Sequence, residues 1–148
     1  MLAMKEYEPD YVDACRSRVE MQVAMFREAS QASRDHGDAD VTGLEGALES
    51  LEYEYFNNML IVLDAFFVHR LRAVEGTDGN ALNEVRVLAR SLMENGGTVL
   101  ADSQITLDPE RTVLGLSVGD PITLTLHQFR RIADAFFREI QSKFSGDR

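Results

Sequence analysis

Apolar side chains recur every three or four positions near the start of the chain, which is the spacing of an amphipathic helix. Pro9 suits a first helical turn, and the polar stretch that begins at Arg34 suits a loop. The pattern predicts a helix over residues 9–34. Its buried stripe would consist of Val12, Cys15, Val19, Val23 and Phe26.

A second stripe of the same period occupies the end of the chain. Thr125 and Gln128 fit a capping box, and Leu124 with Phe129 fits a hydrophobic staple. The pattern predicts a helix over 126–144. Its apolar members are Phe129, Ile132, Ala133, Phe136, Phe137, Ile140 and Phe144.

Two further helices are predicted in the middle of the chain. Thr42 and Glu45 fit another capping box, ahead of a helix over 43–74 that becomes apolar on nearly every side between Met59 and Leu71. A helix of that kind is central and buried, or one of its faces meets another chain. Asn80 is a plausible N-cap for a shorter helix over 81–95.

Residues 98–124 change period. The stretches 112–118 and 122–124 have strand-like composition and flank the turn sequence Gly119-Asp120-Pro121, which predicts a short antiparallel hairpin, with 104–107 as a potential third strand. The predicted fold is therefore mainly α. It is a single domain over 1–148, an up-down four-helix bundle with a β-hairpin inserted before the last helix.

Charge and composition narrow the function classes. The chain of 148 residues has a net charge of −10, and residues 1–60 carry 5 basic and 13 acidic groups. Such an acidic half argues against binding to duplex nucleic acid and suits a basic protein partner. The longest apolar run, 59–68, is too short to span a bilayer, and the first residues lack the apolar core of a signal peptide. With the single Cys15, these features predict a cytoplasmic protein without a membrane segment.

Asp64 is the most informative single residue, because it interrupts the most apolar part of the chain. Its neighbours one helical turn away are apolar, so its own helix offers it no charged partner. A carboxylate in such surroundings is paired across helices, protonates, or faces a cavity. The candidate partners from other segments are Arg86, Arg130 and Arg131.

The densest polar stretch runs from 69 to 86. A histidine with two or three arginines can hold a phosphate or exchange a proton with it. This stretch therefore offers one candidate anion site, although caps and surface charges explain the same residues. The members of that site are His69, Arg72, Asn83 and Arg86.

Residues 38–49 resemble the calcium loop of EF-hand proteins. Asp38, Asp40 and Thr42 take the first, third and fifth positions, a glycine stands sixth, and Glu49 stands twelfth. The resemblance covers only these 12 residues, and Glu45 stands where the pattern has an apolar residue. The capping role of Thr42 is the competing interpretation, under which the protein binds no metal.

Motifs for nucleophilic, phosphate-loop, redox or zinc chemistry are missing from the sequence, and no cofactor is implied. The sequence therefore favours a non-enzymatic interaction or regulatory module that acts as a homodimer. The alternative is an enzyme or ligand-binding protein that uses the candidate anion site. Convergence of its four side chains on one concave site would favour that alternative.

Overall fold

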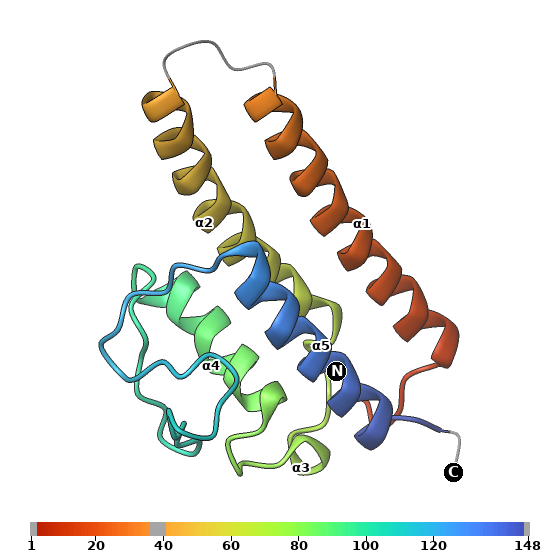
Figure 1. Ribbon diagram of the computed structural model, residues 1–148. Helices are drawn as coiled ribbons and strands as arrows, with labels where there is room; N and C mark the ends of the chain where they lie inside the picture. The colour runs from red at the N-terminus through yellow and green to blue at the C-terminus, as the bar shows by residue number, and fades with distance from the viewer. Residues whose placement is uncertain (1–2, 36–40, 147–148) are drawn as a thin grey trace.

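The computed structural model describes residues 3–35 and 41–146, and side chains in the second range from residue 43. Four long helices dominate it (Figure 1): α1 (Pro9–Asp35), α2 (Val41–Phe66), α4 (Ala81–Glu94) and α5 (Leu126–Lys143). A single turn, α3 (Arg72–Glu75), lies between α2 and α4. The mainly helical class predicted from the sequence is confirmed.

Helices α1 and α2 form a long antiparallel pair. Three contacts fix which residues lie opposite each other: the Tyr11 hydroxyl donates to the Phe66 carbonyl, Tyr55 donates to the Gln22 carbonyl, and Arg34 pairs with Glu45. Helix α5 packs against both members of the pair, and α4 packs against α2 and α5. The far end of the α1–α2 pair extends beyond α5 (Figure 1).

The core lies where α5 meets α1, α2 and α4. Both predicted stripes are confirmed, because every residue predicted for the α1 and α5 stripes is buried. Phe56, Phe67 and Phe136 have no exposed surface, and Phe56 lies 5.4 Å from the ring of Phe129. Two predicted caps are confirmed as well: Asn80 caps α4, and Thr125 forms a capping box with Gln128 at the start of α5.

Helix α2 ends at Phe66, before the end predicted at residue 74. Beyond Phe66 the backbone tightens into bonds between residues three apart, such as Arg70 N to Phe67 O. The N-terminal segment then takes the place of a helical neighbour: Met4 N donates to His69 O, and Leu71 N donates to Met4 O. These contacts come from a segment distant in sequence, so periodicity could not predict them.

The predicted β-hairpin is wrong, since the described residues contain no strand. One antiparallel bridge, Thr98 to Pro121, closes the base of the 98–124 segment. Side chains satisfy the amides that a neighbouring strand would have bonded. The Glu84 carboxylate accepts from Val113 N and Leu114 N, and Asp102 Oδ1 accepts from the amides of residues 104 and 105. The segment is therefore an irregular loop anchored by carboxylates.

Candidate functional site

The polar residues between 69 and 86 gather around one buried carboxylate, that of Glu75. Arg70 Nε donates to Glu75 Oε1 at 2.7 Å, and Arg86 Nη2 donates to the same oxygen at 2.6 Å. Asn83 Nδ2 donates to Oε2 at 2.7 Å. The side chains of Arg70 and Glu75 are fully buried. This cluster ties α3 to α4 and to the chain that follows α2.

Opposing influences act on the pKa of Glu75. Burial is the largest single influence and raises the pKa. The hydrogen bond from Arg86, the charges of Arg70 and Arg86, and the hydrogen bond from Asn83 lower the pKa, and together they outweigh the effect of burial. The net result is a pKa below the ordinary value, so Glu75 is ionised at neutral pH. Its negative charge is compensated by two arginines inside the fold.

Asp64 belongs to the same cluster. Its side chain retains 19% of its exposure, and its Oδ1 accepts from Arg70 Nη2 at 2.9 Å. Arg70 also donates to the carbonyls of Phe67 and Leu82, so its guanidinium joins two carboxylates to two carbonyls. The cation beside Asp64 is thus Arg70, which follows α2 directly, rather than one of the three arginines proposed from the sequence.

The four residues of the candidate anion site separate into two groups. His69 and Arg72 are exposed. Asn83 is buried and Arg86 is partly buried, and both donate to Glu75. The anion that this half of the site holds is therefore the protein's own carboxylate. Chemically, the arrangement locks a turn in place and leaves Asn83 and Arg86 engaged within the fold.

The sequence pattern missed the two central members, Arg70 and Glu75. Arg70 falls inside the helix predicted over 43–74, and Glu75 opens a glycine-rich turn, where an exposed side chain is the ordinary expectation. The available signal was Asp64, whose buried position required a cation. Identifying that cation required knowing where α2 ends.

Glu84 is a second buried carboxylate, on the other side of α4. Both of its oxygens accept backbone bonds of 2.9 Å, from Val113 and Leu114. Burial raises its pKa, and the two amides with the charge of Arg131 offset only part of that rise. This carboxylate fastens the 98–124 segment to the helical core.

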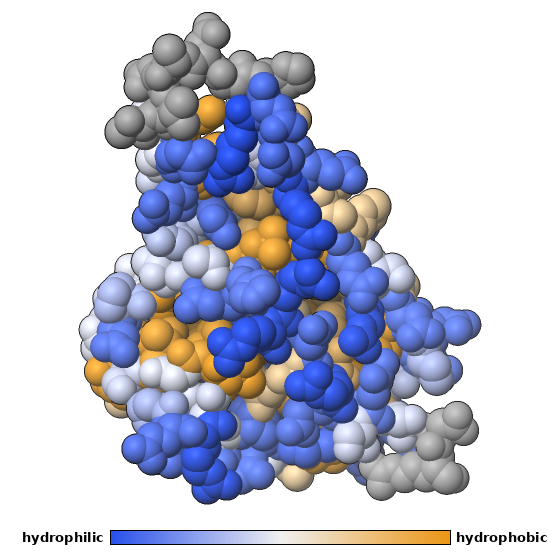
Figure 2. Space-filling view, viewed as in Figure 1, coloured by the Kyte–Doolittle hydropathy of each residue, from blue (hydrophilic) through white to orange (hydrophobic). Residues whose placement is uncertain are grey.

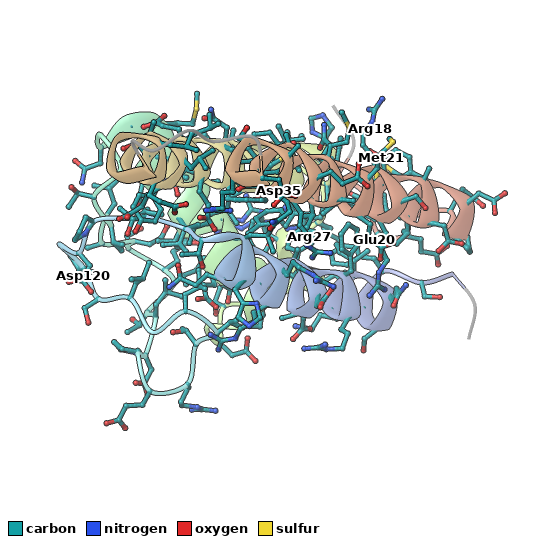
Figure 3. The ribbon with its side chains drawn as sticks, turned by 45° about the horizontal axis from the view of Figure 1, so that its top comes forward. Arg18, Glu20, Met21, Arg27, Asp35 and Asp120 are labelled. Carbon is teal, nitrogen blue, oxygen red and sulfur yellow. The ribbon has the colours of Figure 1, made fainter. Side chains whose placement is uncertain are left out.

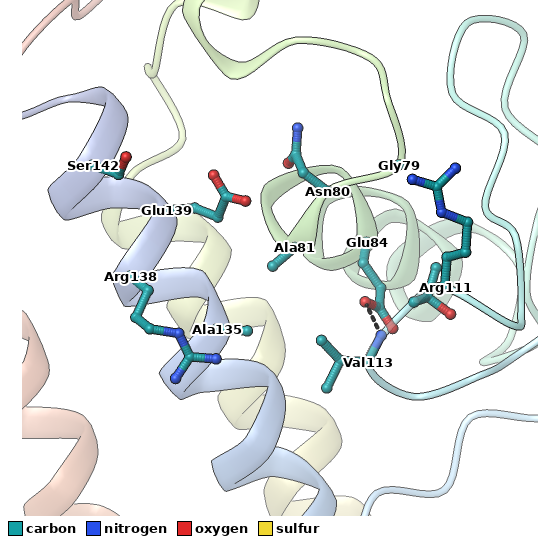
Figure 4. A pocket seen from close by; sticks show the side chains of 11 residues that line it. Gly79, Asn80, Ala81, Glu84, Arg111, Val113, Ala135, Arg138, Glu139 and Ser142 are labelled. Carbon is teal, nitrogen blue, oxygen red and sulfur yellow. Dashed lines mark hydrogen bonds between the residues drawn. The ribbon is translucent and has the colours of Figure 1, made fainter.

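A pocket of about 420 Å³ opens beside Glu84, between α4, α5 and the 98–124 segment (Figure 4). Arg111 and Arg138 flank it from opposite sides, and Glu139 points into it. Within the described residues neither arginine forms an ion pair, whereas Glu139 pairs with Lys143 at 3.2 Å. The groups left unengaged around this pocket are therefore cationic.

A much more apolar surface lies on the side of the α1–α2 pair that faces away from α5. In Figure 3, Arg18 and Met21 lie on that side of α1, whereas Glu20 and Arg27 lie on the side of α5. On α2, the exposed stripe opposite the buried Phe56 lies next to α1 and continues this surface. We call it the outer α1–α2 face. Its exposed side chains are Tyr11, Ala14, Arg18, Met21, Met25, Leu51, Asn58, Val62 and Ala65.

The outer α1–α2 face holds five of the nine large apolar side chains that are exposed in the described chain. Met21 and Met25 are 57% and 58% exposed. A groove of about 630 Å³ occupies the part of this face where α2 ends beside the first turns of α1, lined by Tyr11, Met21 and Phe66 among others. Cys15 reaches the groove, where burial raises the pKa of its thiol and keeps it protonated.

Another apolar area is visible over α4 and the 98–124 segment, at the left of Figure 2. Val118, on the 98–124 segment, is 65% exposed. The cavity beneath it measures about 130 Å³, enough for one side chain. The rest of the face shown in Figure 2 is largely hydrophilic along α1 and α5. The larger groove makes the outer α1–α2 face the stronger candidate for binding.

The remaining candidates concern metal and membrane. Asp38 and Asp40 lie outside the described residues, as does the side chain of Thr42, and Glu49 accepts a bond from Tyr53. Across the described residues, no group of three or more acidic, histidine or cysteine side chains is arranged to hold a metal ion. Nor does any described helix combine the length and apolarity needed to cross a bilayer.

Comparison of the chain with protein-family models, with curated protein sequences and with solved structures gives no match.

Proposed function

We propose that this protein is a non-enzymatic interaction module that docks a protein partner on the outer α1–α2 face. The supporting observation is the concentration of Tyr11, Met21, Met25, Leu51 and Val62 on one continuous surface. Isolated exposed apolar residues are ordinary, but a contiguous apolar patch on a helix pair is typical of a protein contact.

The chemistry of the buried clusters supports the same proposal. Glu75 and Glu84 are both satisfied by groups of the fold, so they serve to fix the segments between the helices. Tyr11 closes one end of the groove by donating to the last carbonyl of α2. The α1–α2 pair is itself held by the contacts of Tyr11 with Phe66, Tyr55 with Gln22 and Arg34 with Glu45, which favours a preformed docking face.

Photo-crosslinking tests this proposal directly. A photoreactive amino acid replaces Met21 in one variant and Val118 in a matched control, which is also apolar and exposed but lies on the 98–124 segment. We expect a discrete protein adduct from position 21 in cells that express the full chain. Val62→Lys on the facing helix should abolish it. Absence of an adduct at position 21, or equal adducts at both positions, would overturn the proposal.

Anion binding in the α4–α5 pocket is the second candidate, favoured by Arg111 and Arg138, which line it and form no ion pair with any described residue. Calorimetry with inorganic phosphate is its test. Saturable binding that disappears in Arg138→Gln would support it, and no heat of binding at millimolar phosphate would reject it.

A further inference from the structure

We infer that the partner on the outer α1–α2 face is a second copy of this chain, related by a twofold axis that crosses α1 at Met21. This inference rests on the proposed docking function and names its occupant. Four features carry it: the charge of the face, the order of its charges along α1 and α2, the match of its apolar residues, and its size.

The first feature is the low charge of the face. A chain with a net charge of −10 repels its own copies, so self-association requires a surface from which acidic groups are largely missing. Arg18 is the charged member of the outer α1–α2 face. Glu28 and Glu54 are exposed at its outer margins, and Asp10 lies at its end beside Tyr11.

The second feature is the order of these charges along the helices. Because α1 and α2 are antiparallel, their contacts show which residues lie at the same level: Phe66 is level with Tyr11, and Tyr55 is level with Gln22. Glu54 is therefore about one residue past Gln22, toward the C-terminal end of α1. Arg18 lies on the other side of Met21, at nearly the same distance. A twofold axis at Met21 therefore brings Arg18 level with Glu54 of the partner subunit. Opposite charges then lie at the same level twice across the contact, one on α1 of one copy and the other on the neighbouring α2 of its partner.

The apolar residues match under the same operation. Val62 lies level with residue 15 of α1, and Leu51 lies level with residue 27, so the two are equally far from Met21. The axis brings Val62 of one copy level with Leu51 of the partner subunit, and it places Met21 against its own symmetry mate. Such self-complementarity is the requirement of an isologous dimer.

The size of the face suits a stable dimer. From Tyr11 to Ala32 the helix is about 32 Å long, and two adjacent helices are about 20 Å wide. A contact of that outline buries roughly 1,200 Å² over both copies, which is within the range of specific interfaces. A basic amphipathic helix from another protein is the competing occupant, and it would not require the pairing of Arg18 with Glu54.

Charge exchange combined with light scattering tests the inference. At about 50 µM the purified chain should have twice the monomer mass of 16.6 kDa. Arg18→Glu and Glu54→Arg should each weaken dimerisation at least tenfold, and the double variant should regain most of it. Arg27→Glu makes the same charge change on the α5 side of α1 and should leave the dimer intact. Circular dichroism and thermal unfolding confirm that each variant is folded.

The outcomes separate this inference from the proposed function. A wild-type mass of 16.6 kDa at all concentrations overturns the second copy. If position 21 then still crosslinks to a different protein in cells, the docking function stands with another partner. A dimer that resists both single charge reversals would overturn the register at Met21.

Discussion

Replacing Arg70 by methionine tests the role assigned to the buried cluster. The Arg70 side chain has no exposed surface, donates to Glu75 at 2.7 Å and to Asp64 at 2.9 Å, and lies 5.4 Å from the centre of the Phe136 ring. Methionine preserves most of the buried volume but none of the donors, so the change isolates the polar contribution.

The expected magnitude follows from what remains after the substitution. Breaking a buried ion pair from one side costs about 3–5 kcal/mol, because a charge is left without its partner. Glu75 keeps Arg86 and Asn83, and Asp64 is partly exposed, so both carboxylates retain some compensation. We therefore expect a loss near the lower limit, about 3 kcal/mol in the free energy of unfolding.

Urea unfolding followed by circular dichroism measures this loss, with Arg72→Met as the matched control. Arg72 is exposed, so its replacement should change the free energy of unfolding by less than about 0.5 kcal/mol. Arg70→Lys should fall between the two, because an ammonium cannot reproduce the forked contacts. If Arg70→Met costs less than about 1 kcal/mol, the cluster does not hold the fold together as described.

Four further predictions concern the carboxylates and one helix cap. The pKa of Glu75 is lowered in the fold, so its stabilising contribution is present above the unfolded pKa near 4.5 and is lost as the pH falls. Urea midpoints measured from pH 6 to pH 3 should therefore fall less steeply with pH in Glu75→Gln than in the wild type. The pKa of Glu84 is raised in the fold, so its stabilising contribution is greatest below the unfolded pKa near 4.5 and declines as the pH rises. Glu84→Gln should remove this decline from the urea midpoints measured between pH 3 and pH 6. Glu84→Ala should also speed amide exchange at Val113 and Leu114 in NMR spectra, more than at Ile122. Thr125→Ala should cost about 1 kcal/mol in the free energy of unfolding through loss of the α5 cap, and an unchanged urea midpoint would contradict that role.

The parts of the fold that depend on local pattern could be predicted from the sequence. The α1 and α5 stripes and the caps at Asn80 and Thr125 arise from contacts within a few residues. The end of α2 could not be predicted, because the backbone of Met4 competes for the groups that would continue the helix. Periodicity carries no information about a segment more than 60 residues away.

The error over 98–124 has a related cause. Residues 112–118 have the composition of a strand, but strand composition predicts extended backbone without saying which acceptor its amides find. Glu84 supplies that acceptor from α4, and Gly115, with a φ of 68°, breaks the extended run. The proposed docking face was partly predictable from the sequence, because the excess of apolar residues in the second helix indicates a contact with another chain as one alternative. Its location between α1 and α2 required the packing of α5 on the opposite side.

Methionine oxidation measures most directly whether the outer α1–α2 face is covered in solution. Met21, Met25 and Met93 are 57%, 58% and 68% exposed in the single chain, so a free chain should react with hydrogen peroxide at similar rates at all three. If a second copy covers the face, Met21 and Met25 should oxidise several-fold more slowly than Met93 at about 50 µM protein. This difference in rate should vanish when the protein is diluted until the dimer dissociates. Equal rates at the three methionines across all concentrations would contradict the account.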